Sequence, residues 1–203
     1  MTDELKLEQL FTETWQTLGR GVADAGHGFH WPVLGTSGPY GVEMRKVVLR
    51  KADRETGTLY CYSDERTGKV AQLRVESRTG WLFYDKKHKV QLRVKGISMA
   101  HHMDETAKEI WQNIEPEKRR DYTGPYAPGS PLKEYDANLA VPFRKDEHEP
   151  DRENTADGLE NFVVVKTTVR ELEYLKLQKE GHIRCLFTRN APGEEWSQIW
   201  LAP

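Results

Sequence analysis

The sequence has little cysteine, no long hydrophobic run and no excess of basic residues, and each absence excludes a class of protein. Its 203 residues contain two cysteines, Cys61 and Cys185, without Cys-x-x-Cys spacing, so we expect buried core thiols rather than a disulfide framework or a zinc knuckle. No apolar run approaches the roughly 20 residues of a membrane-spanning helix. The formal net charge of −2 argues against a nucleic-acid partner. The sequence therefore predicts a soluble, cytoplasmic protein that binds neither membrane nor nucleic acid.

Common nucleotide and metal motifs are also missing. Gly68-Lys69 has Ser63 where a Walker A loop needs its first glycine, and Val70 follows in place of Ser or Thr. No Rossmann glycine fingerprint occurs. His101 and His102 are adjacent on an expected strand and face opposite sides, and His27-x-x-His30 lacks a carboxylate at helical spacing, so no metal site is expected.

Hydrophobic periodicity and turn residues predict one mainly β domain spanning 1–203, a small antiparallel barrel with peripheral helices. An amphipathic N-terminal helix over 1–20 is expected to begin at Thr2 or Asp3 and to end at Gly19 and Gly21. The hydrophilic stretch 145–158 is expected to be a solvated or mobile excursion. Further helices are expected at 68–76 and 104–116, and strands at 42–50, 58–63, 81–84, 89–100, 162–169, 173–177, 182–188 and 196–201.

Cationic and hydroxyl side chains gather between residues 45 and 69. In an extended segment 45–50 the side chains alternate, so that Arg45, Val47 and Leu49 share one face and Lys46, Val48 and Arg50 share the other. A turn entering the next helix carries Tyr62, Ser63, Arg66, Thr67 and Lys69. Backbone N–H groups and the helix dipole favour an anion there. The pattern is that of a phosphate site, and a solvated charged loop is the alternative.

Several motifs along the chain resemble one family. R-x-V-x-L-R at 45–50 is followed by Y-S-D-x-R-T-x-K at 62–69 and V-Q-L-R-V-x-G at 90–96. P-G-S-P at 128–131, H-I-R at 182–184, Trp196 and the final L-A-P continue the pattern. In this order and spacing, the motifs over residues 29–203 resemble the FMN-binding split barrel of pyridoxamine 5′-phosphate oxidase and its relatives.

The resemblance implies a homodimer of six-stranded antiparallel Greek-key split barrels, with FMN bound at the subunit interface. Arg45 and Lys69, with Ser63, Arg66 and Thr67 nearby, would hold the FMN phosphate, and Tyr62 lies beside them. Backbone of Lys46, Val47, Val48 and Leu49 would run along the flavin, and Gln91 would hydrogen-bond its edge. Ser130, Tyr174 and Arg184 would come from the partner subunit. Arg50, Trp111 and His182 are the candidates for the substrate side.

Several positions depart from the oxidase itself. Arg50 replaces a substrate-binding lysine, Tyr174 replaces a tryptophan, and Gly68 replaces a phosphate-binding arginine whose role Arg66 would take. Glu180 stands where the family has the arginine of an Arg-x-His motif that ends here at His182. The sequence therefore resembles the uncharacterised FMN-binding branch more than the vitamin B6 enzyme. An FMN-dependent oxidoreductase acting on a small molecule is expected, with a true pyridoxamine or pyridoxine 5′-phosphate oxidase and a non-catalytic flavin-binding barrel as alternatives.

Overall fold

The structure, a computed structural model, describes residues 3–143 and 149–203 of the chain. The described residues form two compact units. The first unit comprises Met1–Cys61, Glu76–Met99 and Lys166–Pro203, and the second comprises Tyr62–Val75 and Ala100–Val165. The chain passes from one unit to the other within three of its strands, β4, β6 and β7.

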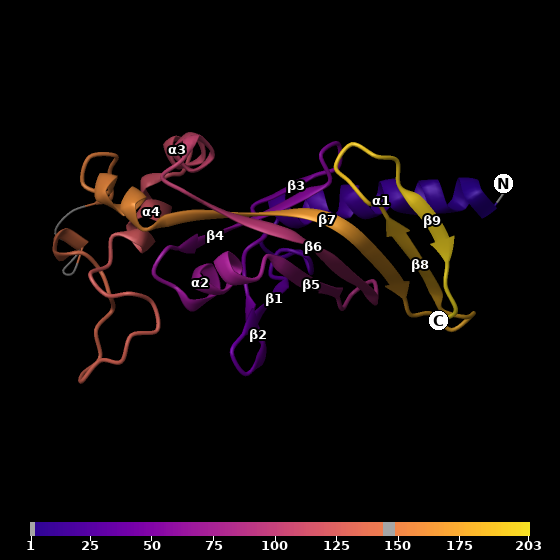
Figure 1. The fold of residues 1–203 in the computed structure, drawn as a ribbon, viewed down its shortest axis with the longest axis horizontal. Helices are drawn as coiled ribbons and strands as arrows, with labels where there is room; N and C mark the ends of the chain where they lie inside the picture. Colours follow the sequence, from indigo (N-terminus) through magenta and orange to yellow (C-terminus); the bar gives the residue numbers. More distant parts are fainter. Residues whose placement is uncertain (1–2, 144–148) are drawn as a thin grey trace. The chain divides into compact units, whose positions relative to one another are not determined.

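Strands make up most of the regular structure (Figure 1). They are β1 (Val33–Gly38), β2 (Gly41–Lys46), β3 (Lys51–Asp53), β4 (Thr58–Asp64), β5 (Arg78–Asp85), β6 (Val90–His102), β7 (Phe162–Lys176), β8 (Ile183–Thr188) and β9 (Ser197–Trp200). The helices are α1 (Asp3–Ala23), α2 (Gly68–Val75), α3 (Glu105–Gln112) and α4 (Pro116–Arg119), with single 3-10 turns η1 (Arg120–Tyr122), η2 (Val141–Phe143) and η3 (Ala156–Glu160). A mainly β fold with flanking helices, as predicted, is confirmed.

All nine described strands belong to one sheet, in the order β2-β1-β5-β6-β7-β4-β3, with β8 paired to β7 and β9 to β8. The printed ladders are antiparallel, as in β5–β6 and β7–β8. The sheet is open, because β2 and β3 end its path unpaired to one another, so the expected six-stranded closed barrel is not confirmed. One physical reason is the length of β7: only Glu171–Lys176 pair with β8, and the rest of its 15 residues serve other neighbours.

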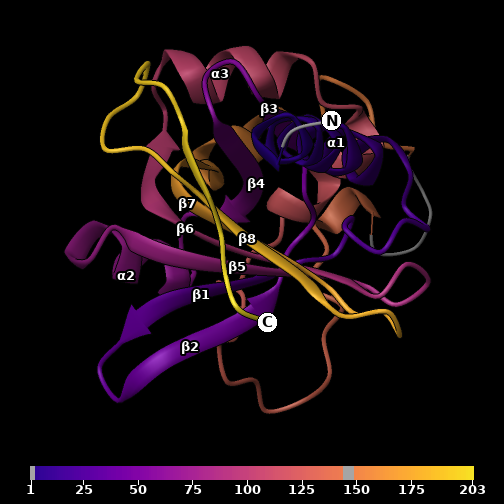
Figure 2. The ribbon, with the colours of Figure 1, turned by 90° about the vertical axis from the view of Figure 1, so that its right-hand side faces the viewer.

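The first unit buries an apolar core between its sheet and α1. Leu34, Trp81, Phe83 and Leu92 are almost fully buried. Phe11 of α1 packs against Phe187 of β8 with ring centroids 4.9 Å apart, which fixes α1 alongside β8 and β9 (Figure 1). Figure 2 shows the β1–β2 hairpin at the edge of the sheet, next to β5. Cys61 and Cys185 are free and fully buried, as expected, and burial raises the pKa of the Cys185 thiol to about 12.

A chain of hydrogen-bonded hydroxyl groups runs through this core. The Ser98 hydroxyl lies 2.7 Å from that of Thr79 and 2.6 Å from that of Thr167, and Trp81 Nε1 donates to Thr167 Oγ1 at 3.1 Å. A buried polar group costs little when its partners are present. The chain of hydroxyls therefore ties β5, β6 and β7 together inside the apolar layer.

The N-terminal helix does not end where the glycines predicted. Helix α1 continues through Gly19 and Gly21 to Ala23, and Thr2, one of the expected caps, lies outside the described residues. A Cβ on Gly21 would lie 2.9 Å from Cβ of Phe29, whereas one on Gly19 would meet nothing within 4 Å. Gly21 is thus required by close packing against the chain that returns at Phe29, and not by a helix end.

The second unit packs around Phe162 and Trp111. The Phe162 ring contacts those of Tyr62, Trp111 and Tyr122, each with centroids 5.1 Å away. Asp104 caps α3 by accepting a hydrogen bond from the Ala107 amide, as the sequence indicated. Of the predicted excursion 145–158, residues 145–148 lie outside the described chain. The remainder forms hydrogen-bonded turns in which Thr155 and Gly158 are buried, and its mobility stays a prediction.

The two glycines of α1 give a matched test of this packing. We expect Gly21→Ala to destabilise the protein by about 1–3 kcal/mol, since the added methyl overlaps Phe29. Gly19→Ala is the control and should stabilise by about 0.5–1 kcal/mol, because alanine is the better helix former. Chemical denaturation of the three proteins measures both values. Equal effects of the two substitutions would show that the Gly21–Phe29 contact is absent.

Candidate functional site

A compact polar cluster lies where β4 turns into α2. Lys69 Nζ donates to Ser63 Oγ at 2.8 Å and approaches Thr67 Oγ1 at 3.4 Å, and the two hydroxyls are 3.1 Å apart. Ser63 is buried, whereas Thr67 and Lys69 are half-buried. The structure thus brings together three of the predicted phosphate-binding side chains. We call Ser63, Thr67 and Lys69 the Ser63 cluster.

Arg66, in the same turn, is held by Asp64. The carboxylate accepts hydrogen bonds from the Arg66 amide at 2.8 Å, from Nε at 3.0 Å and from one terminal nitrogen at 2.6 Å. The other terminal nitrogen donates to the Gly124 carbonyl at 3.0 Å. These contacts use three of the five N–H groups of the guanidinium. The hydrogen bond to Asp64 also raises the pKa of Arg66, so the side chain is an oriented permanent cation with donors to spare.

The cluster and Arg66 stand beside the first turn of an eight-residue helix, α2. The amino end of a helix presents backbone N–H groups and the positive end of its dipole. An ammonium, two hydroxyls and an oriented guanidinium in the same turn are charge-assisted and neutral donors of the kind that bind a phosphate group. Asp64 neutralises part of the positive charge of Arg66, and Lys69 is the second cation of the arrangement.

Arg45 belongs to the first unit and has partners of its own. Its guanidinium donates to Thr36 Oγ1 at 2.5 Å and forms an ion pair with Glu43 at 3.3 Å. Burial lowers the pKa of Arg45, and the nearby Glu43 charge opposes this shift. The side chain is directed along the β1–β2 hairpin by these contacts. Its predicted part in phosphate binding stays a prediction.

The segment after Arg45 is extended but leaves the sheet ladder. The expected strand 42–50 ends at Lys46, and Val47, Leu49 and Arg50 donate their amides to carbonyls of Pro32, His30 and Tyr60. Val47 and Leu49 are buried while Val48 and Arg50 are half-buried, so the predicted alternation is confirmed. Lys46 is exposed.

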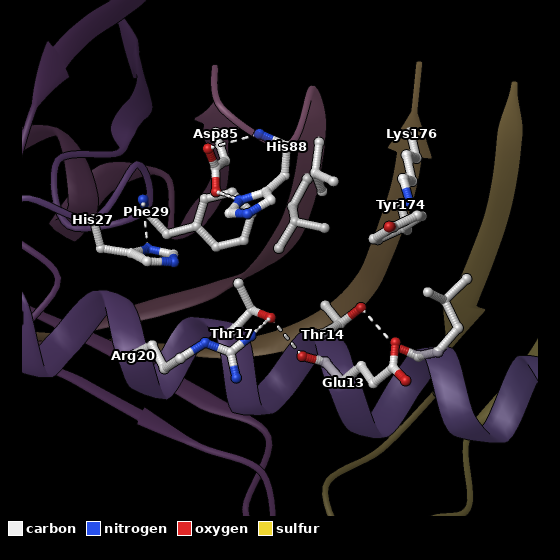
Figure 3. Close-up of a pocket in the computed structure, with 13 residues that line it drawn as sticks. Glu13, Thr14, Thr17, Arg20, His27, Phe29, Asp85, His88, Tyr174 and Lys176 are labelled. Carbon is white, nitrogen blue, oxygen red and sulfur yellow. Dashed lines mark hydrogen bonds and ion pairs between the residues drawn. The ribbon is translucent and has the colours of Figure 1, made fainter. Parts of the chain in front are cut away.

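Tyr174 and Arg184, both expected to reach the flavin, lie on opposite faces of the β7–β8 ladder. Tyr174 pairs with the buried Cys185 and projects from β7 toward α1 (Figure 3). Arg184 instead donates to Glu173 at 3.1 Å, on the other face. Arg93 of β6 also binds this carboxylate, through two of its nitrogens. Hydrogen bonds from both arginines lower the pKa of Glu173 against the opposing effect of its burial.

The remaining predicted residues are dispersed. Trp111 is 5% exposed and packs in the core of the second unit. Arg119 lies over its ring at 4.9 Å and donates to its carbonyl. This position gives no support to a contact between Trp111 and a substrate. His182 is exposed, and its Nδ1 accepts from the Gln178 amide at 3.3 Å. Ser130 lies exposed in the 123–140 loop, and Gln91 is half-buried near the start of β6.

Two important carboxylates were not singled out by the sequence reasoning. Asp64 stands two residues before Arg66, and an Asp at the start of a turn commonly accepts from the amide two residues on, so a local signal existed. Glu173 is 80 residues from Arg93, and no sequence spacing reveals that pair. Among the described residues no group of three or more metal-ligating side chains is found. No described helix has the length and hydropathy needed to cross a bilayer.

The structure is therefore that of a mainly β protein with a candidate phosphate site at the start of α2. Solved structures share its fold. One is a pyridoxamine 5′-phosphate oxidase-related, FMN binding protein from Nostoc punctiforme, with 21% identity, a TM-score of 0.75, and coverage of 95% of this chain and 96% of that one. Another is PhzG from Burkholderia lata in complex with tetrahydrophenazine-1-carboxylic acid, with 15% identity, a TM-score of 0.69, and coverage of 95% and 91%. At these identities the likeness concerns the fold.

A family model matches part of the sequence. Residues 15–102 match the family model described as pyridoxamine 5′-phosphate oxidase, FMN-binding domain. The matched segment includes the β1–β2 hairpin, the Ser63 cluster and Gln91. No curated protein matches the chain. The predicted resemblance to the pyridoxamine 5′-phosphate oxidase family is therefore confirmed.

The pairing of Glu173 with Arg93 and Arg184 predicts a pH-dependent stability. Because the folded-state pKa of Glu173 is lowered, its contribution is complete above the unfolded pKa near 4.3 and is lost as pH falls through the folded value. We expect Glu173→Gln to destabilise by about 1–2 kcal/mol at pH 7 and progressively less below about pH 4. Urea denaturation across this pH range measures the difference.

Glu171→Gln is the matched control for that experiment. Glu171 is on the same strand but is 41% exposed and pairs with an exposed Lys95, so its loss should cost less than about 0.5 kcal/mol. A pH-independent effect of Glu173→Gln would contradict the role assigned to its charge.

Proposed function

We propose that the protein binds FMN and transfers hydride or electrons between the flavin and a small molecule. The observation that carries the proposal is the Ser63 cluster with its oriented Arg66, because these donors match a phosphate monoester and fall inside the segment that matches an FMN-binding domain. In this proposal Ser63, Thr67 and Lys69 hold the FMN phosphate, and Arg66 adds its remaining N–H donors.

The hydrogen-bond donors of the Ser63 cluster and Arg66 suit the phosphate group of FMN. The phosphate of FMN carries up to two negative charges, and Lys69 and Arg66 are cations whose positions are already fixed by hydrogen bonds. Preorganised donors lose less freedom on binding. When bound, FMN supplies the redox chemistry, and the protein supplies position and electrostatics. Arg45, backbone of residues 46–49 and Gln91 are the residues that we assign to the flavin ring and its edge.

A homodimer is part of the proposal, because the first unit exposes an apolar face of its sheet. A concavity of about 750 Å³ over β1, β2, β5, β6 and β7 is lined by Val42, Met44, Leu82 and Ile97 among others. Val42 and Met44 are 69% and 72% exposed. An apolar patch of this kind rarely stays bare on a soluble protein. A second copy of the chain is the occupant that the family resemblance suggests, with the flavin at the interface.

The dimer is tested by placing a charge on that face. We expect Met44→Glu to shift the molar mass measured by light scattering from dimer to monomer, since the carboxylate would be desolvated in the interface. Val75→Glu, at an exposed apolar position in the second unit, should leave the mass unchanged. A Met44→Glu protein that remains dimeric would place the interface elsewhere.

The proposal also concerns the chemical class of the substrate. Glu180 and Gly181 precede His182, so a carboxylate stands at the position where the oxidase resemblance calls for an arginine. A carboxylate repels a phosphorylated substrate, which favours a different small molecule over pyridoxamine 5′-phosphate. Anaerobic reduction of the bound flavin by pyridoxamine 5′-phosphate would favour the oxidase alternative, and a flavin that no small-molecule donor reduces would favour a non-catalytic carrier.

The first experiment on the function is the visible spectrum of protein purified without added flavin, followed by acid release of the chromophore. We expect FMN, and we expect Lys69→Gln to weaken FMN binding by roughly 10- to 100-fold because a charge-assisted contact to phosphate is lost. Fluorescence titration of the apoprotein measures the two dissociation constants.

Arg74→Gln is the matched control for Lys69→Gln. Arg74 carries the same charge on the last turn of α2 and pairs with Glu65, so its loss should change FMN affinity less than about threefold. A colourless protein that fails to bind added FMN would overturn the proposal, as would equal effects of the two substitutions.

A further inference from the structure

A second cavity lies in the first unit, under α1. Its volume is about 390 Å³, within the range of small-molecule sites. Phe29, Val90 and Leu92 are buried in its floor, and Leu10 and Thr14 of α1 form its roof. Figure 3 shows how the wall is completed by the 27–29 loop, the β5–β6 turn and β7. The interior is therefore apolar and partly aromatic.

The Tyr174 hydroxyl is a polar group in the wall of this cavity. The Tyr174 side chain lines the cavity and is only 9% exposed. Within residues 3–143 and 149–203 its hydroxyl has no hydrogen-bonding partner, whereas Thr14, beside it, donates to the Leu10 carbonyl at 2.8 Å. Burial raises the pKa of Tyr174 to about 12, so the hydroxyl stays protonated. An oxygen of a ligand in the cavity would accept a hydrogen bond from this hydroxyl.

The two ends of the cavity differ in charge. At one end Arg20 donates to Thr17 Oγ1 at 2.6 Å, and His27 Nδ1 accepts the Phe29 amide at 3.1 Å, which leaves the N–H of a neutral ring on Nε2. Asp85 is the nearest carboxylate there, and it is engaged by the His88 ring at 2.6 Å and by the Lys87 amide at 2.9 Å. This end therefore presents hydrogen-bond donors, and Arg20 is its cation.

The other end carries Tyr174 with Glu13 and Lys176, whose charges offset one another (Figure 3). Tyr174 and Glu13 both line this end, and the Glu13 charge adds to the rise in the pKa of Tyr174 that burial and Cys185 cause. A neutral hydroxyl suits this end, since it can accept from Tyr174 and donate to Glu13. Glu13 and Arg20 are seven residues apart on α1, which is roughly 10 Å along the helix axis.

We propose that this cavity binds a small hydroxyaryl carboxylate, a single aromatic ring with a carboxylate at one end and a hydroxyl at the other. The carboxylate lies against Arg20 and His27, the ring lies on Phe29 and Leu92, and the hydroxyl exchanges hydrogen bonds with Tyr174 and Glu13. The inference goes beyond the flavin proposal. Tyr174 is the one residue of the predicted FMN set that lines the described cavity, and it faces α1.

The test is isothermal titration calorimetry of the protein as purified, with 4-hydroxybenzoate as the probe. We expect saturable binding of one molecule per chain. Arg20→Gln should weaken it about tenfold or more, because the carboxylate loses a charge-assisted partner. Tyr174→Phe keeps the ring and should weaken 4-hydroxybenzoate about threefold or more while leaving benzoate unchanged. Lys6→Gln on the same helix and Tyr40→Phe at an exposed position are the matched controls.

The flavin spectrum, recorded during the same titrations, separates this proposal from the previous one. If 4-hydroxybenzoate displaces the flavin, it occupies the flavin site and the proposal is overturned. The absence of saturable binding overturns it as well, as does binding to Arg20→Gln and Tyr174→Phe with the affinity of the unaltered protein. Circular dichroism melts of both variants confirm that they are folded before titration.

Discussion

The alternation of side chains along β7 is the constraint on which the first unit depends. Leu172 and Tyr174 point toward α1, and Glu171 and Glu173 point to the opposite face. A strand has a period of two, so neither set can move without exchanging the two faces. One face therefore became the wall of a cavity that the Tyr174 phenol lines, and the other became an open apolar surface crossed by the Arg93–Glu173–Arg184 ion pairs.

The candidate phosphate site depends on local structure, a turn between β4 and α2. Asp64 closes the turn after β4 by accepting from the Arg66 amide, and the same carboxylate orients the Arg66 guanidinium. The helix that begins at Gly68 then sets Lys69 within reach of Ser63. Strand end, turn and helix start thus lie within seven residues, and the donors converge because the backbone between them has little freedom.

Local signals of this kind explain which structural features the sequence could indicate. The donors at 63–69, the cap at Asp104 and the alternation at 47–50 involve neighbours in the chain, and turn chemistry or strand period determines them. The predicted end of α1 at Gly19 and Gly21 was wrong. Gly21 is needed for close packing against Phe29, which lies beyond the end of the helix, where the chain has turned back. The closed six-stranded barrel was not confirmed because strand number and pairing depend on how far β7 extends.

The sequence by itself determined a mainly β protein with two buried thiols, a donor cluster at the start of one helix and a family resemblance, since periodicity, turn residues and ordered motifs are all short-range patterns. Only the tertiary structure decided that Tyr174 and Arg184 face opposite sides, that Trp111 is a core residue, and that α1 roofs a cavity. These facts depend on strand register and on packing between separate segments, and neither leaves a periodic trace in a single sequence.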